Sequence, residues 1–180
     1  MARTEPSIVV RPAQKSDLPA LGRLGAALAR AHHEWDPERF FLPEAGAQGY
    51  SWWLGKEMKN RKAVVLVALR GRRVVGYAYG RLEPRDWNLL RDQCGVGVDL
   101  MVDPKERGHG AGTMLGQALL EALEAKGAPF IVLQAASKNT KAQKLFRSMG
   151  FRPTIVEMTL SLASTRPPRR GRAGGAGRPS

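Results

Sequence analysis

Hydrophobic residues recur along the chain at two spacings, and together these predict alternating strands and helices. Short runs rich in Val, Ile and Leu indicate strands, whereas longer stretches with apolar residues every three or four positions indicate helices. The expected strands are Ile8 to Arg11, Ala63 to Leu69, Arg73 to Glu83, Cys94 to Val102, Ile131 to Gln134 and Ile155 to Leu162. The expected helices run from Ser16 or Asp17 to about Ala31, from Gln48 to Lys59, from about Met114 to Gly127 and from Asn139 to Met149. This mixture predicts an α/β (α+β) fold around one sheet.

Size and composition agree with one globular domain. The chain has 180 residues and is 43% hydrophobic and 25% charged, so it can form a single core. The longest apolar runs, such as Ala63 to Leu69, are shorter than the roughly 18 residues that cross a bilayer. The start of the chain lacks the apolar centre of a signal peptide, and Cys94 is the single cysteine. We therefore expect a cytoplasmic protein without membrane contact, internal disulfide or metal site.

The positive charge is unevenly distributed. The net charge is +13, and five of the positive charges lie in residues 164–180, which hold only small, polar or basic side chains and proline. We expect a folded domain over residues 1–163 and a disordered basic Arg/Gly/Pro tail over 164–180. Subtracting these five charges leaves +8 on the domain, which favours phosphate-bearing ligands. The tail either makes a weak contact with nucleic acid or serves only to solubilise the chain.

The segment from Val98 to Leu115 carries the most chemical information. A predicted strand leads into Gly108, Gly110 and Gly112, and a predicted helix follows. Glycines at the start of a helix expose backbone N–H groups that can bind a phosphate. The Gly-Lys-Ser/Thr ending of a Walker loop is missing, and the glycine spacing fits a dinucleotide fingerprint poorly. Arg107, directly before the first glycine, favours an anion site over a simple turn.

Two spaced motifs in the chain resemble the GCN5-related N-acetyltransferases, the GNAT family. The first is the Arg-x-x-Gly-x-Gly/Ala signature, here Arg107 to Gly112. The second is a helix whose spaced positions are occupied here by Asn139, Ala142, Leu145, Phe146, Gly150 and Phe151. The opening Val9 to Leu21, with a strand, Arg-Pro-Ala and an Asp-Leu helix start, also looks like the family's beginning. The resemblance spans about residues 8 to 162.

The resemblance implies a mixed, mostly antiparallel sheet of about six to seven strands flanked by about four helices. Acetyl-CoA, the co-substrate, would enter a split between the fourth and fifth strands. Its pyrophosphate would contact the N–H groups of the segment after the fourth strand, and its pantetheine would pair with the end of that strand, with a backbone N–H near the thioester carbonyl. The cofactor-binding residues that the resemblance implies are Met101, Val102, Arg107, Gly108, His109, Gly110, Ala111, Gly112, Thr113, Asn139 and Phe146.

The reaction implied is direct attack of a primary amine on the thioester. An alkylammonium, with a pKa of about 10, must first lose a proton to a base. Candidate bases are Asp99, which is preferred for its place on the fourth strand, Glu83, and the pair His32 and His33. Many relatives have a glutamate where this chain has Val98, so the base stays open. A family tyrosine that protonates the thiolate is Phe146 here, which leaves water, Tyr77 or Tyr79 for that role.

The acceptor is the least defined part of the prediction. Six of the twelve aromatic residues lie between residues 35 and 53, among four acidic residues from Glu34 to Glu44, which suits an amine on an apolar or peptide-like body. The preferred function is therefore acetylation of a small-molecule or peptide amine. Two alternatives stay open: a protein or ribosomal-protein N-acetyltransferase with an RNA-contacting tail, and a non-catalytic CoA-binding module. Either a monomer or a homodimer is compatible with the sequence.

Overall fold

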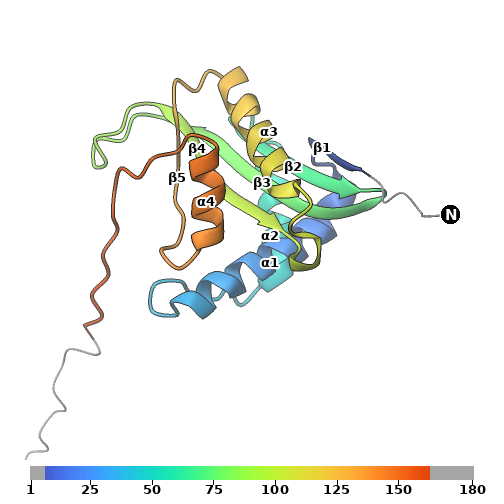
Figure 1. The fold of residues 1–180 in the computed structure, drawn as a ribbon, viewed down its shortest axis with the longest axis horizontal. Coiled ribbons are helices and arrows are strands. Elements are labelled where there is room, and N and C mark those ends of the chain that lie inside the picture. Colours follow the sequence, from blue (N-terminus) through green and yellow to red (C-terminus); the bar gives the residue numbers. More distant parts are fainter. Residues whose placement is uncertain (1–6, 163–180) are drawn as a thin grey trace, which may run out of the picture.

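A five-stranded sheet with helices on both faces forms the centre of the computed structural model, which describes residues 7–162 (Figure 1). The strands are β1 (Ile8–Pro12), β2 (Ala63–Arg70), β3 (Arg73–Glu83), β4 (Cys94–Val102) and β5 (Ile131–Leu133). The helices are α1 (Leu18–Trp35), α2 (Gly46–Glu57), α3 (Ala111–Ala125) and α4 (Thr140–Ser148). Short 3-10 turns precede α1 at Lys15–Asp17 and α3 at Pro104–Glu106. The basic tail expected over residues 164–180 lies outside the described residues.

The strands lie side by side in the order of the chain. The first four pair antiparallel, and β5 pairs parallel to β4. Arg70 pairs with Arg73, so the β2–β3 hairpin turns at Gly71 and Arg72. Gly71 has a φ of 59°, a left-handed conformation that glycine adopts without strain. The mixed, mostly antiparallel sheet that the family resemblance implies is confirmed.

Each face of the sheet has its own hydrophobic core. On one face, α3 packs Leu115, Leu119 and Leu123 against alternate residues of β2, β3 and β4. On the other, α1 and α2 cover the remaining alternate residues, which include Tyr77, Tyr79 and Met101. Alternation along a strand therefore decides which helix layer each side chain of β4 meets.

The contact between α1 and α2 depends on two glycines of α1. A Cβ at Gly22 would lie 2.3 Å from the backbone oxygen of Ala47, and one at Gly25 would lie 2.2 Å from a ring carbon of Tyr50. Distances this short are not tolerated by backbone or by a packed ring. Because both positions are glycine, α2 can pack close to α1, with the ring of Tyr50 against Gly25.

The last predicted strand does not form, which is a correction to the sequence analysis. Residues 152–161 carry no regular secondary structure, and Ile155, Val156, Met158 and Leu160 are 72–90% exposed. The described sheet therefore has five strands where six or seven were expected. The alternating pattern is present, but a strand also needs a neighbour to accept its backbone hydrogen bonds, and this segment lies apart from the sheet (Figure 1).

Candidate functional site

The sheet opens between β4 and β5. The two strands pair only at Gly95, Val96 and Gly97, opposite Ile131 to Leu133, and beyond this point they separate. A cavity of about 70 Å³ occupies the opening. Its walls come from α1, β4, α3, β5 and α4, and they include Leu28, His32, Val98, Asp99, Asn139 and Phe146. The split between the fourth and fifth strands, which the family resemblance implied, is therefore present.

Asp99 projects from β4 toward the helix layer of α1 and α2. It alternates with Leu100, which packs in the α3 core, and it accepts a 2.8 Å hydrogen bond from the hydroxyl of Tyr77. Burial raises the pKa of Asp99, although the hydrogen bond from Tyr77 lowers it, as does the positive charge of His32 when that ring is protonated. A carboxylate that is costly to ionise at the wall of a cavity is a typical feature of binding and catalytic sites.

Two further side chains gather around Asp99. Burial and the negative charge of Asp99 raise the pKa of Tyr50 to about 12, so its hydroxyl stays protonated. His32 lines the cavity, and its Nδ1 lies 2.9 Å from the carbonyl oxygen of Leu28 one turn earlier in α1. The sequence analysis named His32 as a candidate base without relating its position to that of Asp99. These side chains come together because of the angles at which α1 and α2 pack on the sheet. The hydrophobic pattern of the sequence does not specify those angles.

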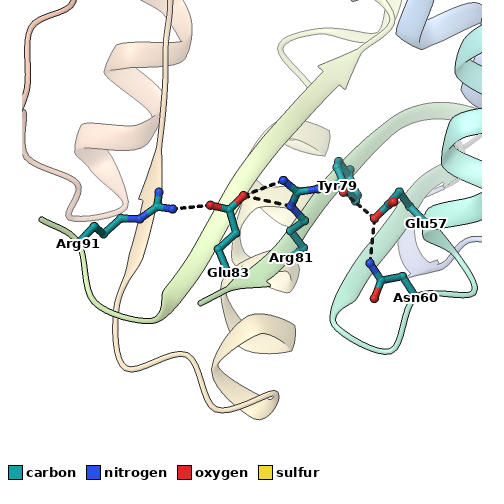
Figure 2. A network of polar contacts seen from close by, with 6 residues as sticks. All are labelled: Glu57, Asn60, Tyr79, Arg81, Glu83 and Arg91. Carbon is teal, nitrogen blue, oxygen red and sulfur yellow. Dashed lines mark hydrogen bonds and ion pairs between the residues drawn. The ribbon is translucent and has the colours of Figure 1, made fainter. Parts of the chain in front are cut away.

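The other candidate bases lie elsewhere. The two histidines point apart: Nδ1 of His33 lies 2.8 Å from the carbonyl oxygen of Phe40, and His33 is not among the residues that line the cavity. Glu83 lies at the far end of β3, opposite Cys94, between Arg81 and Arg91 (Figure 2). Burial favours a higher pKa for Glu83, but the hydrogen bonds from these arginines outweigh it and hold the pKa below its ordinary value. The structure thus brings Asp99 and His32 together and leaves Glu83 apart.

Tyr77 and Tyr79, considered above as proton donors, both donate to carboxylates. The hydroxyl of Tyr79 donates to Glu57 at 2.8 Å, within the network of Figure 2. Burial, with Asp99 near Tyr77 and Glu57 near Tyr79, raises the pKa of both phenols. Cys94 is buried, and burial raises the pKa of its thiol, which disfavours the nucleophilic thiolate. Among residues 7–162, no group of three or more His, Cys, Asp or Glu side chains could hold a metal ion.

The glycine-rich segment forms an open turn at the start of α3. Gly108 and Gly110 both have a φ of 84°, and a Cβ at either residue would meet no atom within 4 Å. The first hydrogen bond of the helix runs from the N–H of Met114 to the oxygen of Gly110. The N–H groups of Ala111, Gly112 and Thr113 precede it, so they have no acceptor within the helix. The turn thus has the space, the free donors and the helix dipole that a diphosphate needs.

Neighbouring charges hold this turn in place. The guanidinium of Arg107 folds back onto β4, where its Nε donates to the oxygen of Val102 at 3.2 Å and a terminal nitrogen lies 3.9 Å from the sulfur of Met101. Glu106 is buried and forms ion pairs with Arg70 and Arg73 of the β2–β3 hairpin. Nδ1 of the exposed His109 lies 3.3 Å from the oxygen of Glu106. These contacts therefore connect the glycine turn to the end of β4 and to the β2–β3 hairpin.

The α4 side completes the cavity. Asn139 caps α4, since its side-chain oxygen accepts from the N–H of Ala142 at 3.1 Å. Phe146 lies about two turns further along α4 and packs edge-on against Phe151. Lys138 donates to the backbone oxygen of Trp35, which ties the β5–α4 loop to the end of α1. Both Asn139 and Phe146 line the cavity.

Comparison with known proteins decides the family. The family model described as acetyltransferase (GNAT) family matches residues 27–151, which include β2 to β5, the glycine turn and α4. The chain belongs to the GNAT acetyltransferase family. This membership makes acyl transfer the general chemistry of the site. Over 142 residues, this GNAT chain is 27% identical to the uncharacterized N-acetyltransferase YhfO of Bacillus subtilis (strain 168), covering 79% of this chain and 88% of YhfO.

Solved structures share the GNAT fold. A variant of the BH1408 protein from Bacillus halodurans has a TM-score of 0.74 and 24% identity, over 86% of this chain and 99% of that one. A GCN5-related N-acetyltransferase from Ralstonia eutropha has a TM-score of 0.66 and 24% identity, over 87% and 99%. The aminoglycoside acetyltransferase meta-AAC0020, from an uncultured soil sample, has a TM-score of 0.61 and 22% identity, over 86% and 96%. At these identities the likeness concerns the fold alone.

Proposed function

We propose that this protein transfers the acetyl group of acetyl-CoA directly to a primary amine of a small molecule or peptide. The observation that carries the proposal is that β4, which lines the cavity, leads directly into the glycine turn at the start of α3. The turn offers free N–H groups for a diphosphate, β4 offers its unpaired edge beyond Gly97, and Asp99 lies at the wall of the opening. When bound, acetyl-CoA supplies an activated thioester carbonyl.

The residues of the chain have distinct tasks in this proposal. The N–H groups from Arg107 to Thr113 bind the diphosphate, and the main chain of Met101 and Val102 aligns the pantetheine arm. Asn139 and Phe146 enclose that arm from the α4 side. Asp99 holds the positive charge of the incoming ammonium group, because a carboxylate in a partly dry site binds a cation strongly. Water protonates the departing thiolate, since the tyrosines named for this role donate to carboxylates and thiolates with a pKa of about 8.5 leave without strong acid help.

The proposal is tested by binding and by turnover. Acetyl-CoA should bind in a titration calorimeter, and thiol should be released when polyamines, aminoglycosides, amino acids and peptide N-termini are offered in turn. Gly110→Asp should weaken acetyl-CoA binding at least tenfold, because it places a carboxylate among the diphosphate donors. Gly127→Asp is the matched control: Gly127 also has a positive φ, 91°, and open space, but it lies at the other end of α3.

The outcomes separate the proposed function from its alternatives. Equal loss of affinity in both glycine variants would show that strain, and not the diphosphate site, is responsible, and would contradict the proposal. Binding of acetyl-CoA without thiol release toward any amine would instead favour a non-catalytic CoA-binding module.

No helix among the described residues is long and apolar enough to cross a membrane.

A further inference from the structure

We infer that Nε2 of His32 is the base that removes the proton from the acceptor's ammonium group, with Asp99 holding the charge beside it. This inference rests on the proposed acetyl transfer and adds a residue and a proton path to it. It begins from the position of His32 in the last turns of α1, at the wall of the cavity that Asp99 also lines.

The hydrogen bond of Nδ1 fixes the tautomer of His32. Its partner at 2.9 Å is the carbonyl oxygen of Leu28, which can only accept, so Nδ1 carries the hydrogen. The neutral ring then has its basic lone pair on Nε2. Among residues 7–162, Nε2 has no hydrogen-bond partner. A histidine that is oriented through one nitrogen and free at the other is a typical arrangement for a general base.

Aromatic neighbours hold the ring in this orientation. The ring of His32 packs edge-to-face with Trp35 at a centroid distance of 5.1 Å and with Phe40 at 5.0 Å. The backbone of Trp35 is tied across the opening by Lys138. The imidazole is therefore fixed between the α1–α2 connection, where the acceptor is expected to enter, and the carboxylate of Asp99.

The charges in the site favour the transfer. An ammonium group bound beside the ionised carboxylate of Asp99 forms an ion pair with no net charge. When its proton moves to Nε2, the positive charge moves to the imidazole, whose charge still interacts with Asp99. The carboxylate is already oriented by Tyr77 at 2.8 Å. The transfer thus leaves the total charge of the buried site unchanged, which avoids the cost of creating an isolated charge there.

The step balances in atoms and electrons. Nε2 takes one proton from the ammonium group, and the amine nitrogen uses the freed lone pair to form a bond to the acetyl carbon. The carbon–sulfur bond then breaks, and its electron pair leaves on sulfur. The nitrogen gives up a second proton as the amide forms, and this proton reaches the thiolate through water. The imidazolium finally releases its proton to solvent.

The test compares two amines that differ in their need for a base. Benzylamine is protonated at pH 7, whereas aniline carries a similar ring and is neutral. His32→Asn keeps a donor for Leu28 but removes the base, so kcat with benzylamine should fall about 100-fold or more and kcat with aniline much less. His33→Asn is the matched control on the same helix and should change both rates less than about threefold. Added imidazole should restore part of the benzylamine activity of His32→Ala.

The results distinguish the base from the function. If the unaltered protein releases no thiol with any amine, the proposed acetyl transfer fails. If it is active and His32→Asn keeps benzylamine turnover within threefold, or loses turnover equally for both amines without imidazole rescue, the assignment of His32 is overturned. Calorimetry with acetyl-CoA should give the same affinity for His32→Asn as for the unaltered chain, because His32 lies away from the glycine turn. A lost affinity would show a structural role and would also overturn the assignment.

Discussion

The pKa of Asp99 and the direction in which its side chain points both depend on the residues around it. Burial raises the pKa of Asp99, and the hydrogen bond from the hydroxyl of Tyr77 counteracts this effect. Sequence reasoning could nominate Asp99 from its strand but could not decide which way it faces. The two core clusters decide it: Leu100 lies in the α3 core and Met101 in the opposite core, so Asp99 faces α1.

Replacing Tyr77 by Phe should shift the pH dependence of activity. The hydrogen bond from Tyr77 lowers the pKa of Asp99, so its loss raises that pKa, and the carboxylate becomes protonated at a higher pH. The acidic limb of kcat/KM should therefore move to higher pH in Tyr77→Phe. Tyr79→Phe serves as the control, since its hydroxyl binds Glu57 and not Asp99. Equal profiles for the two variants would show that ionised Asp99 is not required.

At the scale of helices and strands, the hydrophobic pattern predicted most elements correctly, and tertiary contacts explain the exceptions. The bounds of β3 and β4 agree with the sequence prediction because both strands are long and have partners on each side. Ile155 to Leu162 has the same alternation, but no neighbouring strand pairs with it in the described structure, and so no strand forms. The sequence predicted a helix that starts at Ser16 or Asp17, and Asp17 does precede α1, yet its carboxylate binds Arg11 and not the first N–H groups of α1. The hydrophobic pattern predicts where a helix or strand lies. Contacts with neighbouring elements decide whether a strand forms and what the residues at a helix start bind.

Two glycine-to-alanine substitutions should separate helix propensity from helix packing. Gly25→Ala in α1 should lower the free energy of unfolding by about 1–3 kcal/mol, because the new methyl group would overlap the ring of Tyr50. Gly55→Ala in α2 should instead raise it by up to about 1 kcal/mol, since its Cβ would make ordinary 3.5 Å contacts with Leu18 and alanine favours a helix. Urea denaturation of both variants measures the difference. A stabilising Gly25→Ala would contradict the close α1–α2 contact.

Over the whole molecule, ion pairs connect one secondary-structure element to another. Arg11 at the edge strand binds Asp17 through two hydrogen bonds, of 2.7 and 3.0 Å, and Glu106 joins the β2–β3 hairpin to the glycine turn. The bidentate bond from Arg11, with a further bond from the N–H of Gln14, lowers the pKa of Asp17 in spite of its burial. The first strand is thereby fixed to the start of α1.

Asp17→Asn should destabilise the protein in a pH-dependent way. Because the folded state lowers the pKa of Asp17, its ionised form contributes stability above the unfolded-state pKa of about 3.9. That contribution is lost as the pH falls through the lower folded-state pKa. The variant should therefore be about 1–3 kcal/mol less stable at pH 7, and the difference should shrink below about pH 4. Thermal denaturation across this range measures the effect, and a constant difference would contradict the role of the charge.

The incomplete pairing of β4 also affects how long the folded chain survives. Beyond Gly97, the amides along its outer edge have no strand to protect them from deuterium exchange on the side facing β5. If acetyl-CoA occupies this gap as proposed, it binds only the folded form, and at a hundredfold excess over its dissociation constant it would add about 2.7 kcal/mol to stability. Resistance to proteolysis would then follow the cellular supply of the acyl donor, so that a starved cell would degrade the enzyme faster than a well-fed one.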